Sequence, residues 1–242
     1  MRFVSTVVFV ALTPGLVRVL GRVADAICHD LDLFWQVFFG FVAGALLHWA
    51  LLARLSGFMT FQHEAKHALI ALLFFRRIRQ FVVTWRRGGM IQHAHGFGGA
   101  FGDHAIGLAP YFLPPLTLLT ALLASLAEGE QVRAARLVVG LALAVDLLNI
   151  RYDLRKNFRK DVVPLVDGSQ AQTDIGRRGY IFTVASLAFY GSTLLLLALT
   201  LVLWGYRGLP AVGHAVALAW WDTGLWVVEQ SRVEEMLQLP LI

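Results

Sequence analysis

The segment around which this chain is organised is Phe61-Gln62-His63-Glu64-Ala65-Lys66-His67-Ala68-Leu69-Ile70. Its two histidines are four residues apart, so on an α-helix both imidazoles lie on one face, one turn apart. Two ligands of a tetrahedral zinc ion require this geometry. The glutamate after the first histidine is placed to take a proton from metal-activated water and to give it to a leaving amine. The pattern therefore predicts a hydrolytic zinc site.

Apolar residues flank this motif on both sides, among them Phe58, Met59 and the run from Ala68 to Phe75. We therefore expect a membrane helix that carries His, Glu, Lys and His. An ionisable group at the bilayer centre is unfavourable by roughly 2.5 kcal/mol or more, so a cluster of such groups indicates a functional site. The alternative is a buried polar cluster that joins neighbouring helices by hydrogen bonds.

Composition identifies the class of protein. Of the 242 residues, 57% are hydrophobic and 15% are charged, whereas about 25% are charged in soluble domains. The mean hydropathy is +0.65. These values predict an all-α polytopic membrane protein. The single cysteine, Cys28, excludes an internal disulfide and a zinc site made of cysteines, so the metal ligands must be histidine or carboxylate.

Apolar runs predict about six to seven transmembrane helices in one domain, residues 1–242, the number depending on whether the first segment spans. The second span carries Gly40, Gly44 and Ala45, a small-residue surface suited to close helix contact. His48 lies in the same span, where we expect it to form a hydrogen bond between helices and not to bind metal. The predicted spans are residues 3–17, 33–53, 57–75, 106–126, 134–150, 180–204 and 211–228.

A change of character follows the motif helix. Residues 80–85 and 90–96 have strand-type composition and flank the turn Arg86-Arg87-Gly88-Gly89, which predicts a β-hairpin at the membrane surface. A glycine-rich segment, Gly96 to Gly102, comes next. Lys and Arg are concentrated in alternate loops, with a bias of about three to one. The positive-inside rule then predicts that the hairpin and the C-terminus are cytoplasmic and that the N-terminus is outside, or cytoplasmic as well if the first segment does not span.

These features together resemble the site-2 protease family of intramembrane zinc metalloproteases, in its divergent bacterial form. The resemblance covers roughly residues 57–205 and rests on the motif helix, on the glycine-containing hairpin after it, on the helix start Gly107-Leu108-Ala109-Pro110, and on an aspartate ahead of a later span. It implies a zinc ion held by two histidines and one aspartate.

The residues that match the family motif are His63 and His67 as zinc ligands and Glu64 as the catalytic acid and base. For the third ligand the resemblance favours Asp174, because Gln172-Thr173-Asp174-Ile175-Gly176 is similar to a Ser/Thr-Asp motif and adjoins the sixth span. Asp167, in the segment Asp161 to Gly168, is the second candidate. Asp146 and Asp153 remain open. Lys66 stands where the family usually has glycine.

The expected activity is hydrolysis of peptide bonds in transmembrane or membrane-proximal segments of other proteins, in the bacterial inner membrane. A substrate helix must first be unwound, and addition as an edge strand to the hairpin would achieve this. We therefore expect Val83, in the hairpin, and Gly98 and Gly99, after it, to contact the substrate. The expected partners are a membrane protein or peptide and the lipid bilayer, with no nucleic acid.

Two other functions remain open at this stage. One is a membrane protein that binds haem or a two-metal centre without hydrolysis, as helical bundles do with histidines on facing helices. The other is a member of the same family that has kept the fold without catalysis. An intact His63, Glu64 and His67 favours the peptidase.

Overall fold

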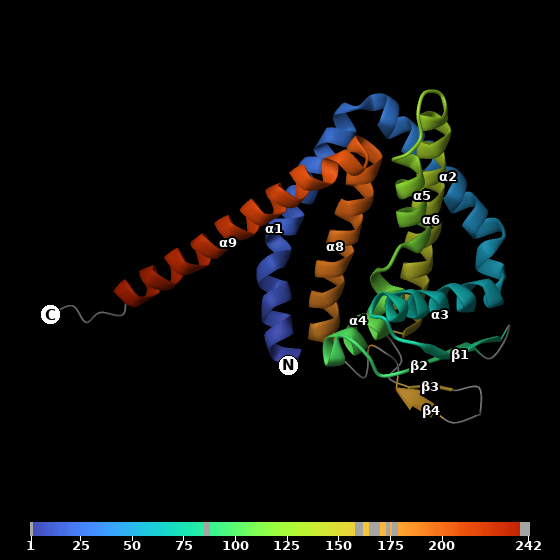
Figure 1. The fold of residues 1–242 in the computed structure, drawn as a ribbon, viewed down its shortest axis with the longest axis horizontal. Coiled ribbons are helices and arrows are strands. Elements are labelled where there is room, and N and C mark those ends of the chain that lie inside the picture. Colours follow the sequence, from blue (N-terminus) through green and yellow to red (C-terminus); the bar gives the residue numbers. More distant parts are fainter. Residues whose placement is uncertain are drawn as a thin grey trace.

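The computed structural model describes residues 2–84, 88–157, 162–164, 170–172, 175 and 179–237. This part of the chain is mostly helical (Figure 1). Its α-helices are α1 (Arg2–His29), α2 (Leu31–Ala50), α3 (Ser56–Leu73), α4 (Gly99–Phe112), α5 (Pro115–Ala124), α6 (Gln131–Asn157), α8 (Tyr180–Trp204) and α9 (Leu209–Leu237). Short 3-10 helices, η1 (Leu52–Arg54) and η2 (Tyr206–Gly208), precede α3 and α9.

The strands form two small antiparallel pairs. Strand β1 (Ile78–Thr84) pairs with β2 (Gly88–His93), and Val83 lies opposite Gly89. This confirms the hairpin predicted after the motif helix, although Gly88 and Gly89, predicted in the turn, are the first residues of β2. A second pair, β3 (Val162–Pro164) and β4 (Gln170–Gln172), follows α6.

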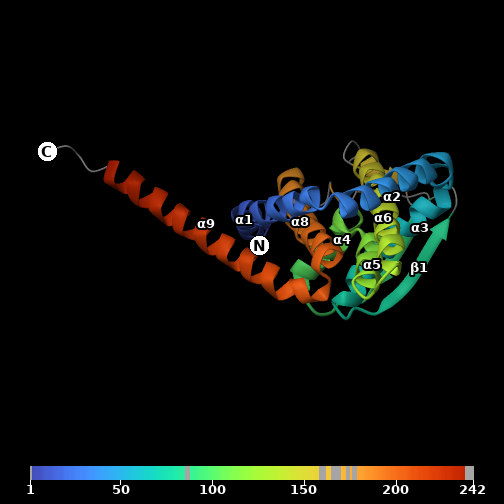
Figure 2. The same cartoon turned by 90° about the horizontal axis from the view of Figure 1, so that it is seen from above.

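The long helices run side by side, whereas the motif helix does not. In Figure 1 the axes of α1, α8, α5 and α6 are roughly aligned, and α3 lies across one end of this bundle, next to β1 and β2. Seen from above in Figure 2, α9 extends away from the other helices. Its first half is attached to α1, where the Trp220 Nε1 donates a hydrogen bond to the Leu12 carbonyl at 3.0 Å.

The number of membrane-spanning helices is smaller than predicted. Among the described residues, α1, α2 and α8 are long and apolar enough to cross a membrane, and α4 with α5 would make a fourth span although they are bent by 80°. The prediction of six to seven spans is therefore wrong. The ionisable residues of α3 and α6 lower the hydropathy of both helices.

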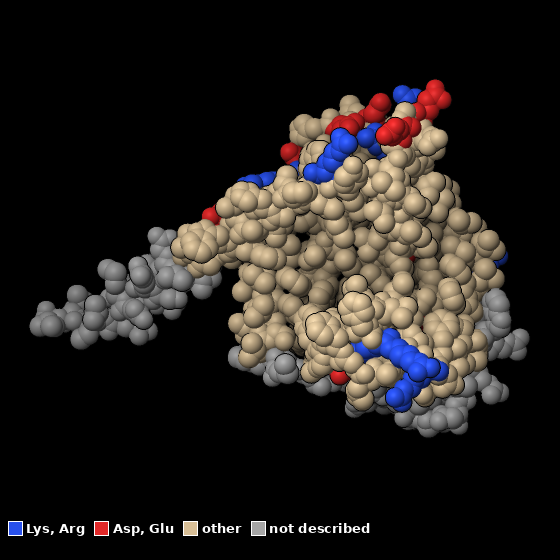
Figure 3. All heavy atoms as spheres, viewed as in Figure 1, with Lys and Arg blue, Asp and Glu red and all other residues tan. Residues whose placement is uncertain are grey.

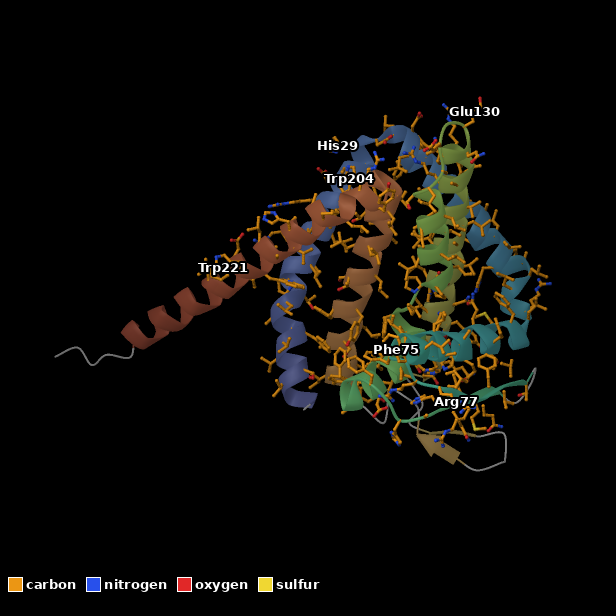
Figure 4. All side chains as sticks on the ribbon, in the orientation of Figure 1. His29, Phe75, Arg77, Glu130, Trp204 and Trp221 are labelled. Atoms are coloured by element: carbon orange, nitrogen blue, oxygen red, sulfur yellow. The ribbon has the colours of Figure 1, made fainter. Side chains whose placement is uncertain are left out.

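Charged side chains gather at the two ends of the bundle. The face in Figure 3 has Lys and Arg at the lower end, both signs of charge at the upper end, and a broad uncharged band between them. Figure 4 places Arg77 and Phe75 at the lower end and His29, Trp204 and Glu130 at the upper end. This distribution is typical of a protein with apolar sides in a bilayer.

Helix α1 begins at the end of the bundle that carries β1 and β2 (Figure 1). The sequence placed these two regions on opposite sides of the membrane, because it counted the motif helix as a span. Since α3 lies crosswise, α1 and α2 carry the chain across and back, and the hairpin returns to the side of the start of α1. The predicted N-terminal orientation relative to the hairpin is therefore wrong.

Glycines bring α2 and α6 into backbone contact. A Cβ added to Gly40 or Gly44 would overlap the carbonyl oxygen of Leu137 or Leu141 in α6, and one added to Gly140 would overlap the carbonyl of Val37 in α2. The prediction that Gly40 and Gly44 form a helix contact is confirmed. This tight pair holds α6 beside the motif helix.

A hydrophobic core fixes α3 against α4 and α8. It includes Ile70 and Ala71 of α3, the run from Ile106 to Leu113, and Phe182 of α8. Helix α3 ends in a Schellman motif, in which the Arg76 amide donates to the Ala71 carbonyl at 2.9 Å and Phe75 takes a positive φ of 53°. The chain thus leaves α3 sharply and enters β1.

Candidate functional site

The two motif histidines share one face of α3, as predicted. The ring centroids of His63 and His67 are 5.0 Å apart. His67 is buried, with 6% of its surface exposed, and His63 is partly buried. The ring of Tyr111, from α4, lies 6.1 Å from that of His63. The imidazoles therefore lie in a protein interior bounded by α3 and α4.

Each imidazole has an oxygen atom next to its Nδ1. The Nδ1 of His67 lies 2.6 Å from the carbonyl oxygen of Ile106, and the Nδ1 of His63 lies 3.2 Å from the Oδ1 of Asp153. Because both partners accept hydrogen bonds, the proton of each ring belongs on Nδ1 and coordination is directed to Nε2. Metal-binding histidines are usually oriented by such an outer acceptor.

Glu64 lies between α3 and the hairpin. Its side chain is buried, with 7% exposed. A Cβ added to Gly89 of β2 would come within 2.8 Å of the Glu64 Oε1 and closer still to its Cγ. The backbone of β2 therefore rests directly on the glutamate. Gly89 is a site residue that the sequence did not single out.

A buried polar face of α6 lies opposite the motif helix. Four of its residues, Asp146, Asn149, Asp153 and Asn157, are each less than one-tenth exposed and follow one another by three or four positions. Among them only the two aspartates were candidates from the sequence. The helical spacing of these four polar residues within an apolar stretch is the signal that would have identified the whole face.

This polar face is joined to two other helices. Asn149 donates to the Gln62 side chain of α3, and its Oδ1 lies 2.9 Å from the Nε2 of His48 in α2. The prediction that His48 forms a hydrogen bond between helices is confirmed. The three side chains hold α2, α3 and α6 together beside the histidines.

Lys66, which lies between the two motif histidines, is fully buried. Its Nζ lies 3.4 Å from the Pro110 carbonyl in α4, and it interacts electrostatically with Asp153 and Asp146. The ammonium group therefore does not reach the membrane surface.

The four candidates for a third ligand have different positions. Asp174 and Asp167 lie outside the described residues. Asp153 approaches His63, whereas the Oδ2 of Asp146 accepts from the amide and hydroxyl of Thr117 in α5. Within the part of the chain that the structure describes, no group of three or more His, Cys, Asp or Glu side chains is arranged to hold a metal. The two motif histidines are thus the described portion of the predicted site.

The predicted substrate-contacting residues occupy two places. Val83 lies in β1, opposite Gly89. Gly98 and Gly99 begin α4 with positive φ values of 87° and 48°. The Arg76 guanidinium donates to the Gly99 carbonyl at 2.9 Å and also pairs with Asp103. The structure therefore gives the two glycines a local role at the junction of α3 and α4.

Comparisons of the chain with protein-family models, with curated proteins and with solved structures found no match. The functional argument therefore depends on the geometry of α3, α4, α6 and the hairpin.

Proposed function

We propose that the protein is an intramembrane zinc endopeptidase of the site-2 protease type. One observation carries this proposal: His63 and His67 lie on one face of α3, and each has an oxygen acceptor at its Nδ1. The alternative is a polar cluster that only joins helices. Such a cluster would not need two neighbouring imidazoles that both direct Nδ1 to an oxygen. This donor set suits zinc.

His63 and His67 would hold the metal through Nε2, with an aspartate as third ligand, for which Asp174 is the first candidate and Asp167 the second. Zinc bound there would act as a Lewis acid for water and for the scissile carbonyl. Glu64 then takes the proton of the attacking water and passes it to the leaving nitrogen. Its burial between α3 and β2 fixes the carboxylate for both transfers.

The hairpin offers a means to open a substrate helix. A two-stranded sheet can accept a further strand at an outer edge, whose backbone groups pair with an extended peptide. Because Gly89 of β2 contacts Glu64, a peptide bound to this hairpin would be held close to the catalytic carboxylate. We infer that the substrates are transmembrane or membrane-proximal segments of other proteins.

We place the enzyme in the bacterial inner membrane, with the hairpin in the cytoplasm. The lower end of the face in Figure 3, which carries the hairpin, has Lys and Arg with little acidic charge. The positive-inside rule assigns such an end to the cytoplasm.

The metal content of detergent-purified protein tests the proposal. We expect about one zinc per chain in the wild type, and its loss in His67→Ala and in one of Asp174→Ala and Asp167→Ala. His95→Ala, a histidine outside the motif, is the matched control and should keep the metal. Absence of zinc from the wild type, or iron in its place, would overturn the proposal and direct attention to a haem or two-metal protein.

Hydrolysis is tested separately with a synthetic apolar peptide of transmembrane length, labelled with a fluorophore and a quencher and inserted in micelles. Glu64→Gln should retain zinc and lose cleavage, because the amide accepts no proton. A wild type that binds zinc and cleaves no membrane peptide would instead indicate a member of the family without catalysis.

A further inference from the structure

The break between α4 and α5 leaves backbone groups without helical partners. The two helices diverge by 80° across the short link Leu113-Pro114. In a continuous helix the amide of residue 114 would donate to the carbonyl of Pro110, but proline has no N–H. In an apolar environment such a carbonyl is costly unless another donor reaches it. The Nζ of Lys66 supplies one, at 3.4 Å.

The start of α5 needs a hydrogen-bond acceptor instead, because the first amides of a helix have no carbonyl partner within it. Its N-cap residue is Pro114, and no cap hydrogen bond comes from that side chain. The Oδ2 of Asp146 in α6 accepts from the Thr117 amide at 2.7 Å and from its hydroxyl at 2.9 Å. Asp146 therefore serves as an N-cap supplied by another helix.

The two side chains match the dipoles of the helix ends that they contact. Lys66 places a positive charge at the C-terminal end of α4, and Asp146 places a negative charge at the N-terminal end of α5, the favourable sign in each case. Both residues are fully buried, and the Lys66 side chain interacts electrostatically with Asp153 as well as with Asp146. Among the described residues no hydrogen-bond donor reaches the second oxygen of Asp146, Oδ1.

The break is connected to the candidate metal site through α4. Lys66 is the neighbour of His67 in α3, and its partner Pro110 lies one turn beyond Ile106, the residue whose carbonyl accepts from the Nδ1 of His67. A shift of α4 at the break would therefore move the oxygen that orients this imidazole.

We propose that Lys66 and Asp146 are a pair of positioning residues. Together they hold the break between α4 and α5, and Lys66 thereby keeps the Ile106 carbonyl on His67. This assigns a role to the lysine that replaces the glycine usual in the family motif. The part concerning His67 rests on the proposed zinc site, whereas the charge pair does not.

A double-mutant cycle on the full-length protein in detergent tests the pair. Lys66→Met and Asp146→Asn should each lower the midpoint of thermal unfolding, Tm, by roughly 6–20 °C, because each removes the interaction of one buried side chain with the other. The double variant should lose clearly less than the sum of the two, since each single variant already removes the interaction between Lys66 and Asp146. Additive losses would overturn the charge pair.

Cobalt(II) in place of zinc tests the positioning of His67. Lys66→Met should weaken cobalt binding by about 10- to 100-fold and shift the visible absorption bands of the bound ion. Leu33→Ala is the control, because it opens a cavity in a core cluster of α2, α5, α6 and α8 that contains no residue of α4, and so lowers Tm without removing a contact of α4. Equal weakening in both variants would overturn the positioning role.

The two proposals fail in different ways. A wild type that binds neither zinc nor cobalt would overturn the proposed function and the link to His67, while the thermal cycle would still decide whether Lys66 and Asp146 act as a pair. Metal binding by the wild type together with additive thermal losses would overturn the pair and leave the zinc site in place.

Discussion

The Oδ1 of Asp153 lies 3.2 Å from the Nδ1 of His63, and both side chains are shielded from solvent. A carboxylate on the outer nitrogen of a metal-binding histidine fixes the ring and makes it a better ligand. This contact joins α6 to the motif helix. It makes Asp153 an orienting residue for His63.

Asp153→Asn should therefore weaken zinc binding by about 10- to 100-fold without removing the site. The amide oxygen can still accept from Nδ1, but it carries no full charge. Zinc affinity is measured by competition with a chromophoric chelator. Asn157→Ala, one turn further along the same face of α6, is the control and should bind zinc normally. A complete loss of stoichiometric zinc in Asp153→Asn would contradict the outer role and make Asp153 a direct ligand.

The hydrogen bonds of Asn149, which donates to Gln62 and accepts from His48, serve a different purpose, because they join three helices and reach neither motif histidine. Asn149→Leu should reduce the free energy of unfolding by about 1 kcal/mol, a typical net value for a hydrogen bond between membrane helices. The zinc content should stay at the wild-type value. Thermal unfolding in detergent measures the stability, and elemental analysis measures the zinc content. A variant that loses zinc at unchanged Tm would show that Asn149 belongs to the metal site.

Much of the candidate site follows from local sequence. The spacing of His63 and His67 is enough to place both rings on one face of a helix, and Gly88 with Gly89 is enough to predict the hairpin turn. Gly40 and Gly44 predict a close contact with another helix, since small residues in an apolar helix allow backbones to approach. In the structure that helix is α6.

The remaining features depend on contacts between distant residues, which no local pattern contains. Hydropathy does not show that α3 lies across the bundle. A helix that crosses the membrane and a helix that lies across the bundle can have the same helical spacing of apolar residues. The role of Lys66 becomes visible only when Pro110 and Pro114 are placed beside it. In the sequence Asp146 is a carboxylate in an apolar run with no evident partner, and only the fold brings Thr117 to its side.

Gly89 should be intolerant of any side chain. Gly89→Ala would push its methyl group into the Glu64 side chain and move the carboxylate, and a displacement of about 1 Å at a catalytic group lowers a rate by roughly 100-fold. Zinc should remain bound. Gly191→Ala is the matched control, because a Cβ at that position in α8 meets nothing within 4 Å. Full cleavage by Gly89→Ala would show that Glu64 has room to move.

Val83 tests the hairpin as a docking strand. Val83→Pro removes an N–H from β1 opposite Gly89, so the strand can no longer offer its complete set of backbone groups. We expect cleavage of the membrane peptide to fall by at least about tenfold, the equivalent of roughly 1.4 kcal/mol, with zinc retained. Val83→Thr keeps both the N–H and the branched side chain and should cleave normally. Equal cleavage by the proline and threonine variants would exclude strand addition at this position.

Stability of the whole assembly should depend on the glycines between α2 and α6. Gly40→Ile introduces a side chain where even a Cβ overlaps the Leu137 carbonyl, so the two helices must separate and lose backbone contact. Overpacking of this kind is unfavourable by about 1–3 kcal/mol, which corresponds to a fall in Tm of several degrees. Gly213→Ile, at a position in α9 with nothing within 4 Å, should leave Tm unchanged. Because α6 carries Asp153, the same separation should also weaken zinc binding in Gly40→Ile. If Tm falls and zinc binding is unchanged, α6 is held against α3 without the help of α2.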